Sequence, residues 1–118
     1  MLIKEVTEQL NIYLEQLKQI FLNNAPPEHI SDRIFFTKMK TETEPIYQLL
    51  DKWEQLAMTS VKNREVSIHP QQVQSTKENY ELIILHSYYI DVRKRRYMEI
   101  YQSIQYIFEQ ILQDRPSG

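Results

Sequence analysis

The side chains best suited to chemistry in this sequence are three histidines, because the chain has no cysteine. Imidazole is a common metal ligand, so the spacing of His29, His69 and His86 decides whether they share an ion. His69 precedes an expected helix and His86 lies near its far end, about 25 Å away by helical rise. Only His29 and His86 leave a metal site open, with a carboxylate from Glu28 or Asp32. We expect no bound metal and no other cofactor.

The remaining residues give little support for a hydrolytic active site. Ser67 and His69 lie close in sequence, but a serine nucleophile also needs a constrained turn beside oxyanion donors, and nothing here indicates one. The carboxylates of Glu42 and Glu44 fall in a polar connection, where we expect both to be solvated. The single glycine, Gly118, leaves no glycine-rich loop that could cradle a phosphate. We expect a protein that is not an enzyme.

A short basic segment, residues 93–96, interrupts an otherwise mixed-charge surface. Its members are Arg93, Lys94, Arg95 and Arg96. Arginine among aromatic rings can bind single-stranded nucleic acid by charge and stacking. However, the net charge is −2, and the nearby Tyr88, Tyr97 and Tyr101 fall on predicted core faces. We therefore expect no nucleic-acid binding, and instead an exposed segment that pairs with Asp91 or Glu99 or contacts a protein.

The scarcity of glycine also favours helices, since hairpin turns and bulges commonly depend on glycine. With 118 residues, 42% of them hydrophobic, the chain can form one domain over residues 1–118 with its own core. No apolar run approaches the roughly 20 residues needed to cross a bilayer. The N-terminal residues alternate charged and apolar side chains, unlike a signal peptide. The sequence predicts a soluble, cytoplasmic helical protein that does not enter membranes.

Apolar residues recur at helical spacing in four stretches. They predict helices over about residues 2–24, 44–63, 70–90 and 94–113. Pro45 suits the first turn of the second helix, with Thr43 or Glu44 as its cap. A single helix over residues 70–113 would be roughly 65 Å long, so we expect the chain to turn back within residues 89–94.

The connection over residues 25–43 is long enough to carry structure of its own. Ser31 and Asp32 can cap a short helix over about residues 32–40. That helix would place Phe35, Phe36 and Lys40 over one end of the bundle. The predicted fold is therefore all-α, an up-down-up-down antiparallel four-helix bundle with a short extra helix in the first connection.

Several short pieces of the sequence follow one another as they do in a known family. They are Phe35-Phe36 with Lys40, Trp53, Ile68-His69 with Gln72, Lys77-Glu78-Asn79-Tyr80, Ser87-Tyr88 and Lys94-Arg95-Arg96-Tyr97. Over about residues 30–112 the chain resembles the YppE-like family, small proteins of Gram-positive bacteria. The resemblance implies a cytoplasmic four-helix bundle. It implies no activity, so no catalytic residue is carried over.

Three residues have expected structural roles. Trp53 should anchor the core. Gln72 can reach back to the free N–H groups at the start of a helix, and Asn79 can hydrogen-bond across helices to fix their register.

The favoured interpretation is a non-enzymatic module that binds another protein through one end or face of the bundle, as a monomer or homodimer. The alternative is a helical bundle that binds a small ligand in a pocket near Phe35, Phe36 and Lys40. The candidate partner or ligand surface comprises Phe35, Phe36, Lys40, His69, Gln72, Asn79, Lys94, Arg95 and Arg96.

Overall fold

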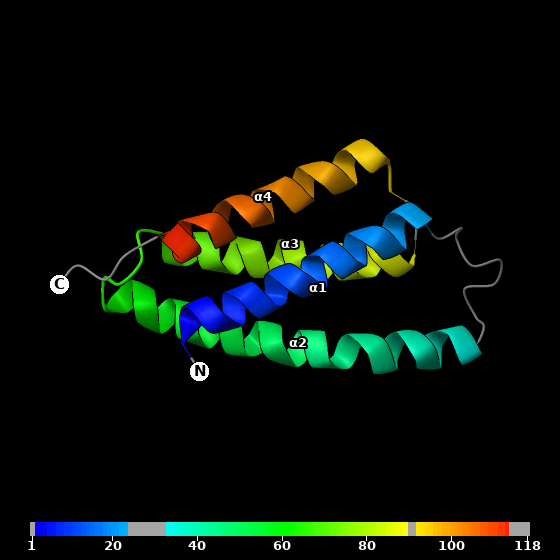
Figure 1. Cartoon of the computed structure of the whole chain (residues 1–118), viewed down its shortest axis with the longest axis horizontal. Helices are drawn as coiled ribbons and strands as arrows, with labels where there is room; N and C mark the ends of the chain where they lie inside the picture. The colour runs from blue at the N-terminus through cyan, green and yellow to red at the C-terminus, as the bar shows by residue number, and fades with distance from the viewer. Residues whose placement is uncertain (1, 24–32, 90–91, 114–118) are drawn as a thin grey trace.

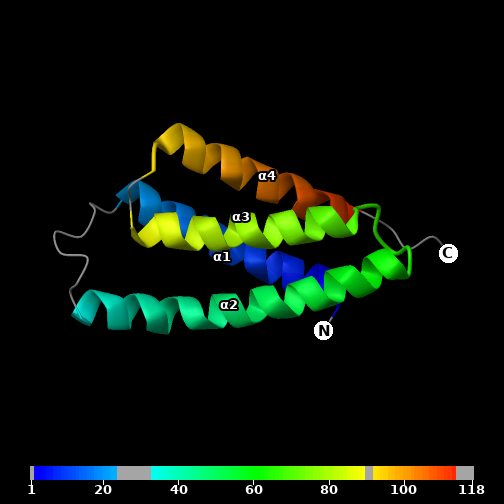
Figure 2. The same ribbon diagram turned by 180° about the vertical axis from the view of Figure 1, so that it is seen from behind.

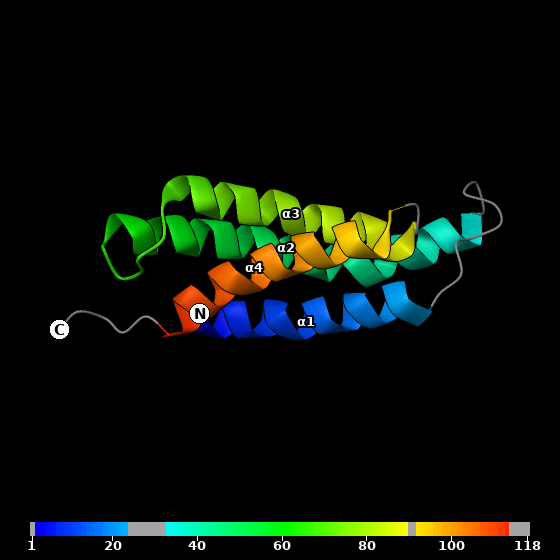
Figure 3. The same cartoon turned by 90° about the horizontal axis from the view of Figure 1, so that it is seen from above.

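The computed structural model describes residues 2–23, 33–89 and 92–113, which fold into helices without a strand. The helices are α1 (Ile3–Asn23), α2 (Arg33–Lys62), α3 (Pro70–Tyr88) and α4 (Lys94–Gln113). Successive helices run in opposite directions along the long axis (Figure 1). The same alternation is visible from behind (Figure 2) and from above (Figure 3). The predicted all-α four-helix fold is confirmed.

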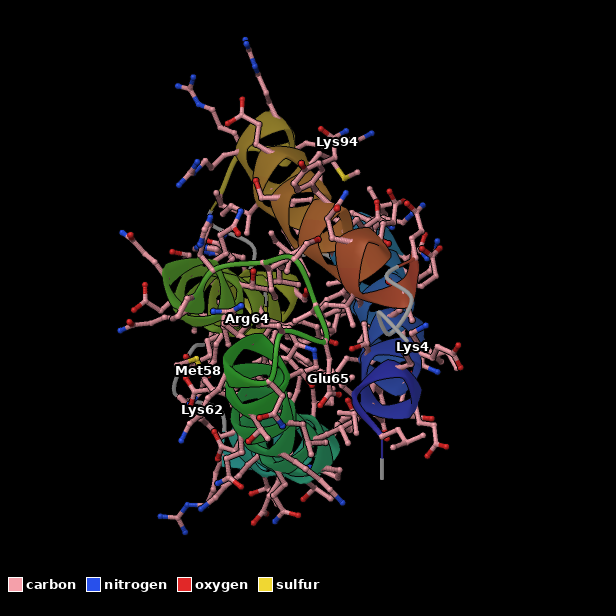
Figure 4. The ribbon with its side chains drawn as sticks, turned by 90° about the vertical axis from the view of Figure 1, so that its left-hand side faces the viewer. Lys4, Met58, Lys62, Arg64, Glu65 and Lys94 are labelled. Atoms are coloured by element: carbon pink, nitrogen blue, oxygen red, sulfur yellow. The ribbon has the colours of Figure 1, made fainter. Side chains whose placement is uncertain are left out.

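The four helices do not pack as a square. α1 and α3 contact each other and each contacts both remaining helices, whereas the backbones of α2 and α4 stay farther apart among the described residues and meet through side chains such as Trp53 and Phe108. Figure 4, which looks along the bundle, shows α2 and α4 on opposite sides of the α1–α3 pair. As a consequence, α3 borders one groove toward α2 and a different groove toward α4.

Trp53 lies at the centre of the core and is fully buried, as predicted. Its ring packs edgewise on Phe108, with 5.6 Å between ring centroids. The indole Nε1–H donates a hydrogen bond to Thr7 Oγ1 over 3.0 Å, and the Thr7 hydroxyl donates to the Ile3 carbonyl over 2.7 Å. α2 is thus joined to α1 by a buried polar contact whose donors are all satisfied.

Four buried tyrosines join the helices by hydrogen bonds. Their hydroxyls meet the Leu10 carbonyl (Tyr80, 2.6 Å), Glu42 (Tyr88, 2.7 Å), Ser87 (Tyr97, 2.7 Å) and Glu15 (Tyr101, 2.9 Å). The Ser87 hydroxyl proton is donated to the Ile83 carbonyl 2.6 Å away, so Tyr97 is the donor in its pair. Each tyrosine therefore buries its ring while its polar tip bonds to a neighbouring helix.

The expected separate helix over residues 32–40 was wrong, because residues 33–62 form the single helix α2. Pro45 lies inside that helix, and the Thr43 hydroxyl donates to the Met39 carbonyl over 2.8 Å instead of capping a helix start. Proline leaves the carbonyl four residues earlier, that of Thr41, without its N–H partner. Thr41 and Pro45 are both exposed, so water can bond that carbonyl and the helix continues.

The helix ends on either side of the α2–α3 connection follow known capping chemistry. Arg64 has a positive φ of 58°. The N–H of Glu65 donates to the Ser60 carbonyl over 2.8 Å, and that of Arg64 to the Val61 carbonyl over 3.1 Å. These two bonds satisfy carbonyls at the end of α2. α3 then begins at Pro70, where the sequence placed its start.

Some predicted features fall on residues 24–32 and 90–91, outside the described part of the chain. They are the metal-site candidates His29, Glu28 and Asp32, the cap Ser31 and the pairing candidate Asp91. None of the helices in the described ranges is both long and apolar enough to cross a membrane.

Candidate functional site

A groove of about 820 Å³ lies between α3 and α4. Its lining comes from His69, Gln71, Gln72, Ser75, Thr76 and Asn79 on the α3 side and from Glu99, Gln102, Ser103, Tyr106 and Ile107 on α4. We call this surface the α3–α4 groove. It gathers three residues that the sequence singled out: His69, Gln72 and Asn79.

One end of the groove is held by the start of α3. His69 is the N-cap residue, with extended backbone angles, and its N–H donates to Gln72 Oε1 over 2.9 Å. This is the reach-back that the sequence predicted for Gln72. Because the amide oxygen of Gln72 accepts this bond, the two Nε2 hydrogens of the same side chain can donate to other groups. Pro70 begins the helix at a position where its missing N–H costs nothing.

Asn79 lies two turns farther along α3 and is half-buried in the groove wall. The predicted bond that would fix helix register is not formed, since the Asn79 amide pairs with no side chain of the described residues on other helices. Its amide instead supplies the groove with both a donor and an acceptor.

The basic segment reaches the groove at its opposite end. Residues 93–96 are all exposed, as predicted. Arg95 Nε lies 3.4 Å from Glu99 Oε1, and Arg96 Nη1 lies 3.7 Å from Glu99 Oε2. Glu99 itself lines the groove. These exposed ion pairs contribute little stability, but they place Arg95 and Arg96 beside the mouth of the groove and offset its carboxylate, whereas Lys94 does not line the groove.

Phe35, Phe36 and Lys40 are not brought to this groove, because they lie on the first turns of α2, whereas the groove is lined from the α3 and α4 sides. The Phe35 ring packs edgewise on Tyr89 at 5.6 Å and on Tyr88 at 6.5 Å. Phe36 lies 5.9 Å from the Tyr89 ring. The two phenylalanines thus cover the end of α3, and the structure separates them from His69.

Sequence reasoning missed most of the polar lining on both walls. Those residues are Gln71, Ser75, Thr76, Gln102, Ser103 and Tyr106. A signal was present, since polar residues recur every three or four positions beside the apolar stripe of each helix. Such a stripe is ordinarily solvated, and only the packing of α3 on α4 makes it a groove wall.

The groove combines hydrogen-bonding groups with apolar surface. Its lining residues are mostly uncharged amides and hydroxyls, with the Glu99 carboxylate and the His69 imidazole at opposite ends, while most of the lining surface itself is apolar. Within the described ranges, no group of three or more histidine, aspartate or glutamate side chains is placed to hold a metal ion. The arrangement suits recognition of a largely uncharged partner that has both apolar and hydrogen-bonding groups.

Known proteins resemble this chain over most of its length. Residues 7–114 match a bacterial family described as a domain of unknown function, DUF1798. This chain belongs to the DUF1798 family. It is also 27% identical over 103 residues to the uncharacterized protein YppE of Bacillus subtilis (strain 168), a match that covers 86% of this chain and 82% of YppE. The resemblance to the YppE-like family is confirmed.

Solved structures share the fold of this DUF1798 member. The crystal structure of YppE from Bacillus subtilis aligns with a TM-score of 0.77 at 21% identity, over 95% of this chain and 90% of YppE. A protein of unknown function from Listeria innocua aligns with a TM-score of 0.75 at 18% identity, over 93% of this chain and 87% of the other. At these identities the likeness concerns the fold and assigns no activity.

Proposed function

We propose that this DUF1798 protein is a non-enzymatic binding module that holds a segment of another protein in the α3–α4 groove. The observation that carries the proposal is the groove itself, about 820 Å³, in which mostly uncharged amide and hydroxyl residues border an apolar surface. We place this activity in the cytoplasm, a compartment with which a chain without cysteine is compatible.

The dimensions of the groove suit a polypeptide. From His69 to Asn79, α3 advances roughly 15 Å at 1.5 Å per residue. An extended peptide of about five residues, or a helix of about ten, spans that length. Two antiparallel helices form a trough that such a segment can follow, and main-chain groups of an extended segment need the donors and acceptors that amides provide.

The charge distribution favours a partner segment with few charges along the middle of the groove. Gln72, Asn79 and Ser103 contribute no formal charge there. The Ser103 hydroxyl already donates to the Glu99 carbonyl over 3.0 Å, so its oxygen presents mainly an acceptor. An acidic residue in the partner could meet Arg95 or Arg96 at the mouth.

A blocking variant tests the proposal. Ser75→Arg and Ser103→Arg together place long side chains on opposite walls, at exposed helical positions where arginine suits the helix at least as well as serine. The matched control is Thr41→Arg, at an exposed position on α2. In affinity capture from native lysate with quantitative mass spectrometry, the wild type and the control should retain the same partner, and the blocked variant should lose it at least about tenfold. Equal capture by all three would contradict the proposal.

Small-ligand binding is the second candidate, favoured by the volume of the α3–α4 groove. Ligand sites commonly enclose about 300–1,000 Å³. Because of that size, we place this candidate in the α3–α4 groove instead of near Phe35, Phe36 and Lys40. Thermal unfolding with a set of small polar compounds separates the two candidates. A compound that raises Tm for the wild type, but not for the blocked variant, would favour the ligand.

A further inference from the structure

The groove on the other side of α3 has different chemistry. Two hollows of about 480 Å³ each lie between α2 and α3. One is lined by Tyr47, Glu78, Glu81, Leu82 and Leu85, and the other by Glu54, Gln55, Met58, Pro70, Gln71 and Gln74. We call this continuous surface the α2–α3 seam. Lys77 lies between the two hollows.

Large apolar side chains reach solvent along the seam. Their exposed fractions are 38% for Tyr47, 42% for Met58, 37% for Leu82 and 46% for Leu85. Tyr47 and Met58 are three helical turns apart, so they share one face of α2. Figure 4 shows Met58 on the side of α2 turned away from α1. A row of this kind on a surface otherwise rich in charge is typical of a contact site.

The rim of the seam is negatively charged. Glu78 and Glu81 line one hollow and Glu54 the other. Lys77 Nζ lies 3.0 Å from Asp51 Oδ1 and 3.2 Å from Glu54 Oε1, and these bonds raise the pKa of Lys77. One lysine thus satisfies two carboxylates of α2, whereas Glu78 and Glu81 of α3 form no ion pair within the described residues. Burial, and then the charge of Glu81, raise the pKa of the Tyr47 phenol, in accord with a negative potential at this surface.

We propose that the α2–α3 seam docks a basic amphipathic helix of a partner protein. The apolar face of that helix would cover Tyr47, Leu82 and Leu85, and its lysines or arginines would lie beside Glu78 and Glu81. Helix-in-groove recognition uses this combination of an apolar stripe and flanking charges. The seam lies across α3 from the α3–α4 groove, so this inference is independent of the proposed function.

A second copy of the chain is the less suitable occupant. Its densest basic segment, residues 93–96, lies at the start of α4, so contact through that segment would join two unlike surfaces, and such contacts form open chains unless the rotation closes a ring. The charge complementarity therefore favours a separate partner helix.

The test uses a fluorescent peptide of about eighteen residues made of leucine and lysine, with leucines at i, i+3, i+4 and i+7. The matched control peptide has the same composition with the leucines spread around the helix. Binding is followed by fluorescence anisotropy at physiological salt. The full chain should bind the amphipathic peptide at least about tenfold more tightly than the control peptide.

Two paired variants locate the binding. Leu82→Ala with Leu85→Ala, and separately Glu78→Gln with Glu81→Gln, should each weaken the peptide at least about tenfold. The control pair Ile12→Ala and Glu8→Gln changes the same kinds of exposed residues on α1 and should leave the affinity unchanged. Circular dichroism of each variant confirms that the fold is retained.

Four outcomes would overturn the inference. Equal binding of both peptides, or unchanged binding by the seam variants, would mean that general charge attraction holds the peptide to the protein and that the α2–α3 seam does not. Loss of peptide by the Ser75→Arg and Ser103→Arg variant would place the site in the other groove. Sedimentation showing self-association that Leu82→Arg abolishes would make the occupant a second copy. Peptide binding that the seam variants alone remove supports the inference, whether or not the α3–α4 groove has a partner.

Discussion

At the scale of single residues, Trp53 shows how one side chain can join two helices. It is fully buried, packs on Phe108, and gives its only donor to Thr7, whose own proton goes to the Ile3 carbonyl. Trp53→Ala should lower the free energy of unfolding by about 3–5 kcal/mol, because it removes the ring and leaves a cavity. Thr7→Val should cost about 1–3 kcal/mol, because the indole N–H loses its acceptor. Urea denaturation measures both losses, and a loss below about 1 kcal/mol for Trp53→Ala would contradict this account.

The buried tyrosines predict how stability depends on pH in the alkaline range. Burial raises the pKa of Tyr97 to about 12, and burial also raises the pKa of Tyr80, Tyr88 and Tyr101. Their stabilisation is fully present below the unfolded value near 10, since both states are then protonated. It is lost as pH rises through the folded values, because the unfolded chain releases protons that the folded chain retains.

Stability should therefore fall steeply above about pH 10, over a window that for Tyr97 ends near pH 12. Far-ultraviolet circular dichroism and tyrosinate absorbance should change together in that window. Tyr97→Phe should reduce the slope of the free energy of unfolding against pH. Full tyrosinate absorbance in a chain that keeps its helical signal would show that these hydroxyls are accessible.

Which residues the sequence could predict depends on what determines their position. The burial of Trp53 follows from helical spacing, and the bond from Gln72 to His69 is local, within one turn. The groove roles of Ser75 and Ser103 depend on how closely α3 and α4 approach. No local sequence pattern determines the distance between two helices, so the sequence alone indicates that these two serines are ordinary solvated residues.

At the scale of elements, α2 is the helix that sequence reasoning divided wrongly. A proline after a polar stretch is typical of a helix start, and the sequence does not show that the Thr41 carbonyl faces solvent. The start of α3 at Pro70 and that of α4 at Lys94 were predicted correctly, because a new apolar stripe begins near each of them. Existence and type of each main helix were therefore predictable, and the continuity of α2 was not.

Pro45→Ala tests the continuity of α2 directly. Inside a helix the exchange restores an N–H for the Thr41 carbonyl and removes a ring clash, and it should stabilise the protein by about 1–3 kcal/mol. At the first turn of a separate helix it would be close to neutral. Thermal or urea unfolding measures the change, with the exposed Gln48→Ala on the same helix as the control for propensity alone. A neutral result for Pro45→Ala would contradict a continuous α2.

At the scale of the whole molecule, the contact between α1 and α3 determines the surface. Because these two helices close on each other, the backbones of α2 and α4 stay apart, with Trp53 and Phe108 meeting between them, and α3 borders two grooves. One groove is lined mostly by uncharged polar residues, and the other has exposed apolar side chains with an acidic rim. The sequence predicts four antiparallel helices. Which diagonal pair of helices comes into contact depends on the sizes of central side chains such as Tyr80 and Trp53.

The basic segment is a further whole-molecule feature with a measurable consequence. Arg95 and Arg96 pair with Glu99, and the net charge of the whole chain is −2. We expect no binding of single-stranded DNA or RNA at physiological salt, and only weak retention at low salt, since phosphate contacts weaken steeply as salt displaces them. Filter binding measures this. Submicromolar affinity that survives physiological salt and disappears on changing Arg95 and Arg96 to Glu, with the fold intact, would reverse the conclusion.

The central claim is that the α3–α4 groove holds a partner protein, and site-specific photo-crosslinking tests it most directly. Benzoylphenylalanine replaces Tyr106, which is 59% exposed in the groove, or Ile12, which is 54% exposed on α1. In native lysate, the account predicts a discrete cross-linked protein from position 106 and none from position 12. Excess wild-type chain should compete it away, whereas excess Ser75→Arg and Ser103→Arg chain should not. The same cross-linked products from both positions, or competition by the blocked chain equal to that by the wild type, would contradict the claim.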